Sequence, residues 1–338
     1  MKCIKNNEAK VRRSADVYAI EKAIAELSVL IRQGKAGVVN IQRALRVSYP
    51  SAAKIYDLII DTSGINIKKN IFEPDEKRQF IYLEQLLLDA LPDSGYTSDE
   101  VYERLNAEMA AIEELGMAAD FLFAHSVAGI LRELTDYPCF VGIGCCSLVA
   151  YIIGITGTEL DPIRHGLIFE RGFGEDKKPE NPFSFFVFEE IMSEFKERIN
   201  KIYGDSLTYS RDGGSVLSAG DASITILDSI EPLQYAYAQL ETSLCNSAIA
   251  VFQEDYMRLM HYAAGYDYTE ADRIRRIIEK RKIKEILKYR KDFVRKARHL
   301  PYAESQRLFT EIQFNLNRAC CKAYVLSVKT VLDAYFPF

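Results

Sequence analysis

The sequence predicts a mainly helical α+β protein that begins with a winged helix-turn-helix. Three observations support this fold class. A pattern of short helices and a tight turn lies near the N-terminus, at 38–61. Apolar residues recur at helical spacing in later segments such as 97–116. The uncharged run 139–157 indicates a strand, a Gly-rich turn and a buried helix.

The helix-turn-helix is predicted from the order of helix starts and stops in the first 75 residues. A helix is expected from about residue 16 to 32, before the glycines at 34 and 37. The run "VVNIQRALRVSYPSAAKIYDLIID" (38–61) predicts a short helix over 40–45, a turn, and a second helix with Pro50 at its first position. Residues 64–74 are expected to form a small wing.

This segment resembles the gamma domain of FtsK-type DNA translocases, a winged helix. The residues that match it in kind are Gln42, Arg43, Leu45, Arg46, Tyr49, Ala52, Ala53 and Lys54. Pro50 and Ser51 replace an Asn-Arg pair of the family at the start of the recognition helix, so sequence preference is expected to be modest. The resemblance implies DNA contacts by Arg43, Arg46, Ser51 and Lys54. The alternative is a helix-turn-helix that contacts protein.

The helices that follow are predicted from amphipathic spacing. Segments 75–91 and 97–116 are expected to be helical. In the second, one face carries Val101, Leu105, Met109 and Ile112. No internal repeat of 20–50 residues is visible, which excludes the usual solenoid and propeller architectures.

The net charge of −5 is unevenly distributed along the chain. Residues 1–70 contain 13 basic and 6 acidic residues, and residues 250–300 contain 14 and 8. Residues 71–249 contain 12 basic and 31 acidic residues. Polyanionic DNA is therefore expected to be attracted to the two ends of the chain and repelled by its middle.

Cysteine usage and the N-terminus point to a cytoplasmic protein. The seven cysteines show no C-x-x-C spacing, so a zinc site is not expected. The charged N-terminus has no apolar segment of the secretory type. Residues 138–158 are uncharged and long enough to span a bilayer, but their glycines and Pro138 favour a buried strand, turn and helix. No membrane association is expected.

From about residue 100 the chain resembles the alpha subunit of bacterial DNA polymerase III, the C-family replicative polymerases. The run "RLNAEMAAIEELGMAADFLFAHSV" (104–127) matches the start of the family's palm. The run "VGIGCCSLVAYIIGITGTELDPIRHGLIFER" (141–171) matches its Gly-rich phosphate site. Four residues are missing between Gly144 and Ser147, including an Arg-Gly-Ser that grips the incoming triphosphate in the family. We therefore expect the strand and helix of this site to be present without the residues that hold the triphosphate.

The resemblance also locates the positions of the family's catalytic aspartates. In the family these bind two Mg²⁺ ions, which activate the primer hydroxyl and neutralise the leaving pyrophosphate. This chain has Phe183, Phe185 and Val187 there, and a Phe cannot ligate a metal. A third family aspartate corresponds to either Asp221 or Asp228. We therefore expect no catalytic residues, no metal and no cofactor.

The third block resembles the fingers of the same family. The run "LETSLCNSAIAVFQEDYMRLMHYAAGYDYTEADRIRRIIEKRK" (240–282) matches it in order and spacing. Residues 273–298 contain 13 basic and 3 acidic residues. In the family this region lies near the template and the nucleotide. The resemblance implies DNA contacts by Arg275, Arg276, Lys280 and Lys282; the alternative is a solvated helix face.

These features predict three domains and one leading function. The domains are a winged helix over 1–75, a reduced C-family palm-like domain over 76–235 and a helical fingers-like domain over 236–338. We expect a catalytically inactive, replication-associated relative of the polymerase, of mobile-element or phage origin, that binds duplex DNA and replication proteins. One alternative is an active minimal polymerase with rearranged metal ligands. The other is an interaction scaffold or decoy that docks on replication machinery.

Overall fold

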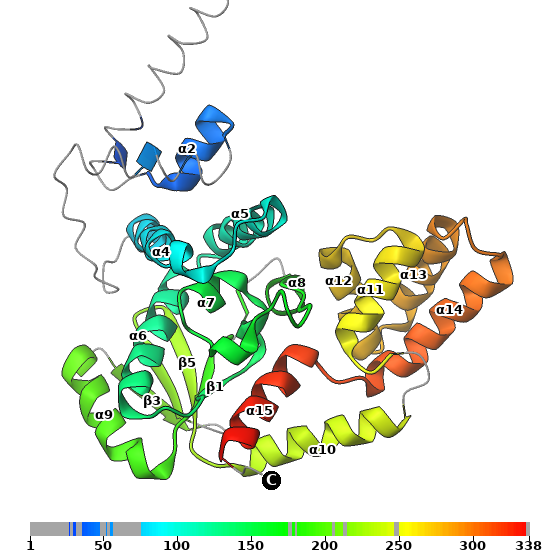
Figure 1. Ribbon diagram of the computed structural model, residues 1–338. Helices are drawn as coiled ribbons and strands as arrows, with labels where there is room; N and C mark the ends of the chain where they lie inside the picture. The colour runs from blue at the N-terminus through cyan, green and yellow to red at the C-terminus, as the bar shows by residue number, and fades with distance from the viewer. Residues whose placement is uncertain are drawn as a thin grey trace, which may run out of the picture. The chain divides into compact units, whose positions relative to one another are not determined.

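The computed structural model covers most of the chain from residue 76 onward and short stretches before it. The described residues are 27, 30–31, 36–47, 52, 55–56, 76–174, 178–179, 181–204, 207–211, 215–246 and 250–335. They are mainly helical and include one five-stranded sheet, which confirms the predicted α+β class (Figure 1). The chain divides into two compact units, Met1–Leu122 and Phe123–Phe338.

The first unit is helical in its described part. Its elements are α2 (Val38–Leu45), α4 (Glu76–Ala90), the 3-10 helix η1 (Leu91–Ser94), α5 (Asp99–Glu114) and the start of α6 (Ala118–Leu134). Helices α4 and α5 confirm the two helices predicted there. The predicted apolar face of α5 is buried: Val101, Leu105, Met109 and Ile112. Ser98 caps α5, because its hydroxyl oxygen accepts the N–H of Val101 at 3.4 Å.

Helix α2 corresponds to the first helix of the predicted helix-turn-helix and begins two residues earlier than expected. Val38, Val39 and Ile41 are buried, and Arg46 ends the helix with a φ of 53°. The predicted start of the second helix, with Pro50 and Ser51, lies outside the described residues. Lys54 and the predicted wing also lie outside them, so the winged helix stays a prediction.

The second unit is built around a sheet with the strand order β1-β2-β5-β4-β3. Its strands are β1 (Phe140–Val141), β2 (Ser184–Phe186), β3 (Leu207–Arg211), β4 (Ser215–Ala219) and β5 (Ala222–Leu227). Strands β2 and β5 are parallel, and the other neighbours are antiparallel. Along β5 buried and half-buried residues alternate, as expected for a strand with one face in the core.

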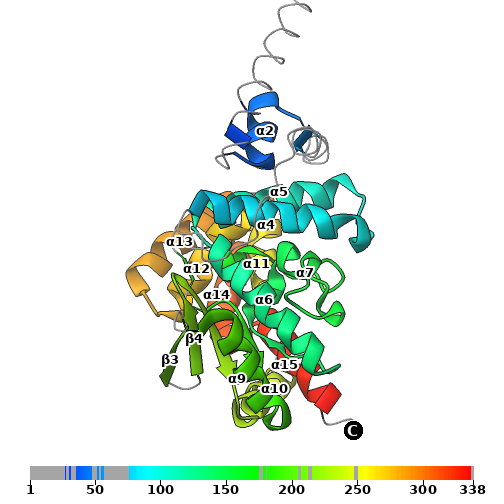
Figure 2. The ribbon, with the colours of Figure 1, turned by 90° about the vertical axis from the view of Figure 1, so that its left-hand side faces the viewer.

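Helices that precede and follow the strands in the sequence pack against the sheet and against one another. Helix α6 lies beside α9 (Glu189–Tyr203) (Figure 2). The rings of Phe123 and Tyr203 meet there edge to face at 5.0 Å. Helix α15 (Lys322–Tyr335) packs on β1 and on the turn that follows it. The short helical elements are η2 (Ile143–Cys146), α7 (Leu148–Ile152), η3 (Thr158–Leu160) and α8 (Glu170–Phe173).

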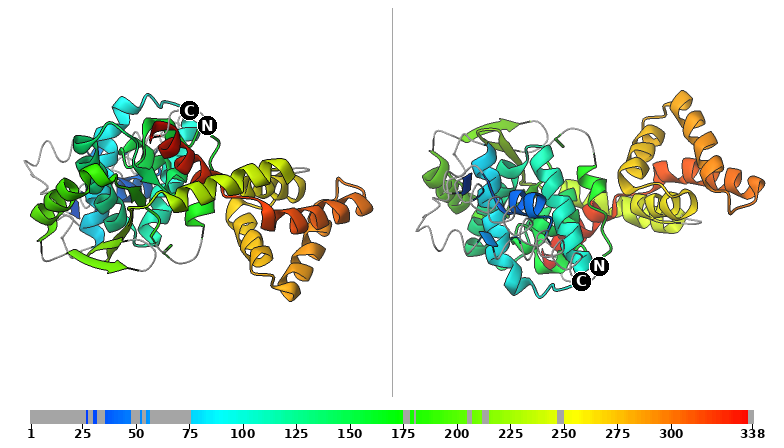
Figure 3. Two further views of the ribbon diagram at one scale, coloured as in Figure 1. Left: turned by 90° about the horizontal axis from the view of Figure 1, so that it is seen from below. Right: turned by 90° about the horizontal axis from the view of Figure 1, so that it is seen from above.

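The helices near the C-terminus form a second core within this unit. They are α10 (Glu231–Asn246), α11 (Gln253–Ala264), α12 (Tyr268–Glu279), α13 (Ile283–Lys296), α14 (Tyr302–Asn315) and η5 (Leu316–Arg318). Buried side chains such as Met257, Ile274, Phe293 and Phe309 hold α11 to α14 together. Figure 3 shows these four helices grouped at the end of α10 that is remote from the sheet.

The uncharged run at 139–157 is mostly buried in the second unit, as predicted. It forms β1, the Gly-rich turn and α7, which is the expected order of strand, turn and helix. Among the described residues no single helix combines the length and apolarity of a membrane span. The consecutive helices α5 and α6 meet that test only as a bent pair.

Candidate functional site

The Gly-rich turn after β1 uses its backbone donors inside the protein. The N–H of Gly142 donates to the Ser327 hydroxyl oxygen at 2.9 Å, and the N–H of Gly144 donates to the Pro182 carbonyl oxygen at 3.1 Å. Phosphate-binding turns work by pointing such N–H groups at an anion. These two N–H groups are therefore not available to a phosphate in this arrangement.

The residues predicted to stand at the positions of the family's catalytic aspartates lie in the apolar core of the sheet. Phe183, Phe185 and Val187 are 0%, 1% and 0% exposed. Phe183 fills the space beneath the turn: a Cβ on Gly144 would lie 2.6 Å from its ring. The ring of Phe140 meets that of Phe185 edge to face at 5.6 Å. The turn and strand β2 are thus closed against each other by aromatic packing.

These residues do not fit the divalent metal ions of the family. Mg²⁺ requires oxygen ligands in near-octahedral geometry, and hydrocarbon side chains offer none. Among the described residues, no group of three His, Cys, Asp or Glu side chains could hold a metal ion. The chemistry that two such ions supply in the family has no ligand set at this position.

Strand pairing distinguishes the two candidates for the third family aspartate. Phe186 pairs with Leu227, and Asp228 follows directly, at the end of β5 that lies next to Val187. Asp221 lies in the turn before β5, at its opposite end. Of the two, Asp228 is therefore the residue that lies at the same end of the β2–β5 pair as Val187. Its side chain is exposed, whereas that of Val187 is buried.

Arg275 of the basic run is buried rather than presented to solvent. Its side chain is 2% exposed and forms ion pairs with Asp272 at 2.6 Å and Glu279 at 2.8 Å. Arg276 is 26% exposed and pairs with the same Asp272. The position of Arg275 does not support the predicted DNA contact, because its charge is neutralised inside α12.

Helix α13 presents a continuous basic face to solvent. Lys284, Lys288, Lys291 and Arg295 are exposed and recur every three or four residues. The opposite face is buried through Ile286 and Phe293. In the described part of the chain no acidic side chain pairs with the three lysines.

The two predicted lysines lie at the N-terminal end of this face. Lys280 and Lys282 are both exposed, between α12 and α13. Lys282 pairs with Glu285 at 3.3 Å, and both side chains are about half exposed. Exposed pairs of this kind are weak, so Lys282 can exchange its partner for a phosphate at little cost.

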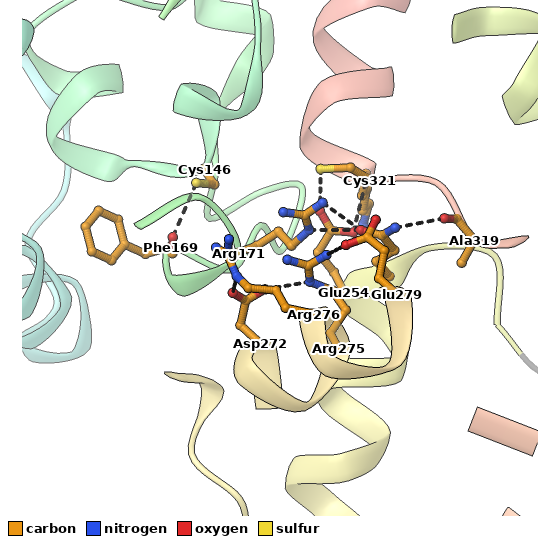
Figure 4. Close-up of polar contacts among 12 residues, drawn as sticks. Cys146, Phe169, Arg171, Glu254, Asp272, Arg275, Arg276, Glu279, Ala319 and Cys321 are labelled. Carbon is orange, nitrogen blue, oxygen red and sulfur yellow. Dashed lines mark hydrogen bonds and ion pairs between the residues drawn. The ribbon is translucent and has the colours of Figure 1, made fainter. Parts of the chain in front are cut away.

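A buried polar network, which the sequence analysis did not predict, joins α8 to α11 and α15 (Figure 4). Arg171 donates two hydrogen bonds to the side-chain oxygen of Gln253, at 3.1 Å and 2.6 Å. Gln253 in turn donates to the carbonyl oxygens of Ala319 and Cys320, at 3.1 Å and 2.9 Å. The network therefore connects three segments that are far apart in sequence.

Glu254 is the second hub of the same network. It is fully buried and accepts the N–H groups of Lys322 at 2.9 Å and Ala323 at 3.2 Å, so it caps α15 from α11. Burial lowers the pKa of Arg171, but the neighbouring Cys321 and Glu254 outweigh this effect and raise it above its usual value. Burial raises the pKa of the Cys321 thiol to about 12. The only sequence signal for this network was the match of Gln253 and Glu254 to the fingers motif.

The predicted contacts of the helix-turn-helix are only partly described. Arg43 is 58% exposed and pairs with Glu113 of α5 at 3.1 Å. Arg46 is exposed at the end of α2. Ser51 and Lys54 lie outside the described residues. The structure thus leaves the predicted DNA contact of this segment untested.

Two family models of bacterial DNA polymerase III alpha match separate segments of this chain. The model of the bacterial DNA polymerase III alpha NTPase domain matches residues 81–206. The model of the bacterial DNA polymerase III alpha subunit finger domain matches residues 224–300. These ranges include the Gly-rich turn and β2 in the first case, and α11, α12 and α13 in the second.

Curated proteins similar to this chain include several named DNA polymerase III subunit alpha. The DNA polymerase III subunit alpha of Aquifex aeolicus is 37% identical over 105 residues, which are 29% of this chain and 9% of the relative. That of Thermus aquaticus is 36% identical over 97 residues, 26% of this chain and 8% of the relative. That of Yersinia pestis is 35% identical over 136 residues, 38% of this chain and 11% of the relative. The aligned part spans about a tenth of the length of these relatives. Residues 81–206 and 224–300 are thus related to the alpha NTPase and finger domains of bacterial DNA polymerase III subunit alpha.

Proposed function

We propose that this protein is a DNA-binding, replication-associated relative of DNA polymerase III subunit alpha that does not synthesise DNA. The observation that carries the proposal is the basic face of α13, with Lys284, Lys288, Lys291 and Arg295 exposed on one side of a single helix. The predicted division into domains at 1–75, 76–235 and 236–338 is kept as part of the proposal.

DNA binding through this face follows from its charge and geometry. Lysines three and four residues apart lie on one side of a helix, so several can approach one phosphate backbone together. Each phosphate contact releases counterions, so the logarithm of affinity falls with the logarithm of salt concentration by about 0.9 per contact. Lys280 and Lys282 extend the face toward α12, whereas Arg275 is left out of the surface because it is buried.

The helix-turn-helix segment is proposed as the second DNA contact. Arg46 is exposed, and Arg43 pairs with Glu113 only at the surface, so both arginines can reach a phosphate. Ser51 and Lys54 complete the proposed set. Pro50 has no backbone donor and Ser51 can pair with several bases, so we expect modest sequence preference.

Catalytic inactivity is supported by two separate features. Phe183, Phe185 and Val187 offer no metal ligands, and the N–H groups of Gly142 and Gly144 are used internally. Phosphoryl transfer depends almost entirely on positioning and on stabilisation of charge, so either feature alone removes most of the rate. The alternative, an active minimal polymerase, requires a ligand set built around Asp228.

One experiment tests binding and activity on the same protein. Fluorescence anisotropy with duplex DNA across a salt series should give binding that weakens with salt. The double variant Lys284→Ala/Lys288→Ala should flatten the slope by roughly two. The control Lys196→Ala/Lys201→Ala removes the same charge from exposed positions of α9 and should leave the slope unchanged. Primer extension with Mg²⁺ or Mn²⁺ should be absent.

Two results would overturn the proposal. Primer extension that Asp228→Ala abolishes would establish the active alternative. Absence of duplex binding at low salt would favour the interaction scaffold, which the acidic middle of the chain supports: residues 71–249 contain 12 basic and 31 acidic residues. In that case the acidic surface would be the contact, and basic replication proteins the partners to test.

A further inference from the structure

Helix α2 is held at its N-terminus by a side chain from another helix. Both oxygens of the Glu84 carboxyl group, in α4, accept backbone N–H groups of α2: Val38 at 3.0 Å and Val39 at 2.9 Å. These are the first two residues of α2, which has no acidic residue of its own in its first turn. Glu84, from helix α4, therefore supplies the cap that a helix N-terminus normally takes from its own preceding residue.

The surrounding residues are shaped around this contact. Glu84 is fully buried. Gly37 leaves the room for it: a Cβ at that position would lie 1.7 Å from the Glu84 Oε2 atom. The backbone of Gly37 is extended, with a φ of −127°, so the space and not the conformation requires a glycine.

A surface ion pair lies at the other end of the helix. Arg43, in the last turn of α2, pairs with Glu113 of α5 at 3.1 Å. A cleft of about 380 Å³ lies beside these contacts and is lined by Asn40, Ile81 and Glu113 among others. Glu84 itself does not line this cleft and is fully buried.

We propose that Glu84 is a proton-controlled latch: its ionisation sets how firmly α2, and with it the predicted helix-turn-helix, is docked on α4. A carboxyl group held away from water costs less free energy when it is neutral. The docked state therefore favours the protonated latch, and an undocked α2 leaves Glu84 in water, where the ionised form is favoured.

The groups that face Glu84 also shift its pKa. Burial raises the pKa of Glu84 from its ordinary value of 4.5 to about 8, against the lowering effect of the N–H groups of Val39 and Val38. Glu113, on α5, raises the pKa further, and Arg43, on α2, lowers it.

The sign of the pH dependence follows from this direction. The docked state binds the proton more tightly than the undocked state. Docking is therefore strongest below about pH 4.5, weakens through the interval, and has lost the contribution of Glu84 above about pH 8. Within the interval, the undocking equilibrium should rise by about tenfold per pH unit.

Amide hydrogen exchange of the full-length protein tests the latch without using DNA, so its outcome is independent of the proposed function. After correction for intrinsic exchange, opening at Val38 and Val39 should increase between about pH 5 and about pH 8, by about tenfold per unit. The variant Glu84→Gln should remove this dependence, since the amide side chain does not titrate. The control Glu103→Gln, at an exposed position of α5, should keep it.

A second variant keeps the test decisive if Glu84→Gln does not fold. Gly37→Ala retains the glutamate but places a methyl group where its Oε2 atom lies, so it should also abolish the pH dependence at Val38 and Val39. Equal opening of the wild-type protein at both ends of the pH range would overturn the proposal. So would a pH dependence that survives in either variant.

Discussion

The Gly-rich turn with β2 and the basic face of α13 resemble two parts of one polymerase family, yet they differ in what their side chains meet. Phe183 is 0% exposed and packs beneath the turn, whereas Lys288 lies on a solvent face. A buried carboxylate without its metal ions carries a large desolvation cost, so apolar residues are stable there. Solvated lysines on a helix surface carry almost no such cost. The comparison teaches that Phe183 and the residues around it follow the demands of packing, while the basic face remains open to a ligand.

The largest expected effect on the free energy of unfolding comes from placing an aspartate at the buried position of Phe185. Phe185→Asp should lower the free energy of unfolding by more than about 4 kcal/mol, because it buries a carboxyl group without a partner. The apolar control Phe185→Leu should cost less than about 2 kcal/mol. Urea denaturation followed by circular dichroism measures both. An unchanged midpoint for Phe185→Asp would mean that this position opens to water, and the comparison would fail.

Two basic residues of one run should behave in opposite ways. Arg275→Met should lower the free energy of unfolding by about 3 kcal/mol, because it removes one partner of a buried ion pair with Asp272. Lys288→Met should change it by less than about 0.5 kcal/mol.

DNA affinity should show the reverse order for the same two variants. Lys288→Met should flatten the salt dependence by about 0.9, since it removes one phosphate contact, and Arg275→Met should not. Denaturation and anisotropy on the same preparations make the measurement. Equal effects of both variants on stability and binding would contradict the distinction between a buried and a solvent-facing part of the run.

Removal of the Glu254 side chain should have an intermediate effect on the free energy of unfolding. Glu254→Ala removes the acceptor for two backbone N–H groups of α15 and should cost about 2 kcal/mol of stability. The control Glu304→Ala, at an exposed position in the first turn of α14, should cost less than about 0.5 kcal/mol. Thermal unfolding of the two variants is sufficient. A loss as small as that of the control would show that α15 does not depend on this cap.

The smallest effect concerns the accessibility of thiols around the turn. Burial raises the pKa of Cys139 to about 12 and that of Cys145 well above its usual range. At about pH 8 both thiols should therefore resist maleimide in the folded protein and react once it is unfolded. Peptide mass spectrometry assigns the label. Labelling of Cys145 in the folded protein at the unfolded rate would indicate an open turn and blur the comparison.

Local patterns were sufficient for the elements whose signals are short-range. The spacing of Val101, Leu105, Met109 and Ile112 predicted the buried face of α5. The glycines and the uncharged run at 139–157 predicted a strand, a turn and a helix. The first helix of the helix-turn-helix was also predicted, with its start displaced by two residues. Each of these depends on interactions between residues close in sequence.

Contacts between distant residues were beyond such patterns. Arg275 and Lys288 both lie in basic helical segments, and nothing local distinguishes the buried one from the exposed one. The cap that Glu84 gives to α2 joins residues 45 positions apart. The network of Arg171, Gln253 and Glu254 joins residues up to 82 positions apart. Their partners become neighbours only after the helices have packed.

By itself, the sequence determined the mainly helical α+β class, the position of the Gly-rich turn, the apolar residues at 183, 185 and 187 and the concentration of basic residues at 273–298. The tertiary structure decided which charges are exposed and which are neutralised internally. It also decided that Asp228, not Asp221, lies at the end of β5 next to Val187. The physical reason is that burial and ion pairing depend on atoms brought together from separate segments, whereas secondary structure depends largely on spacing along the chain.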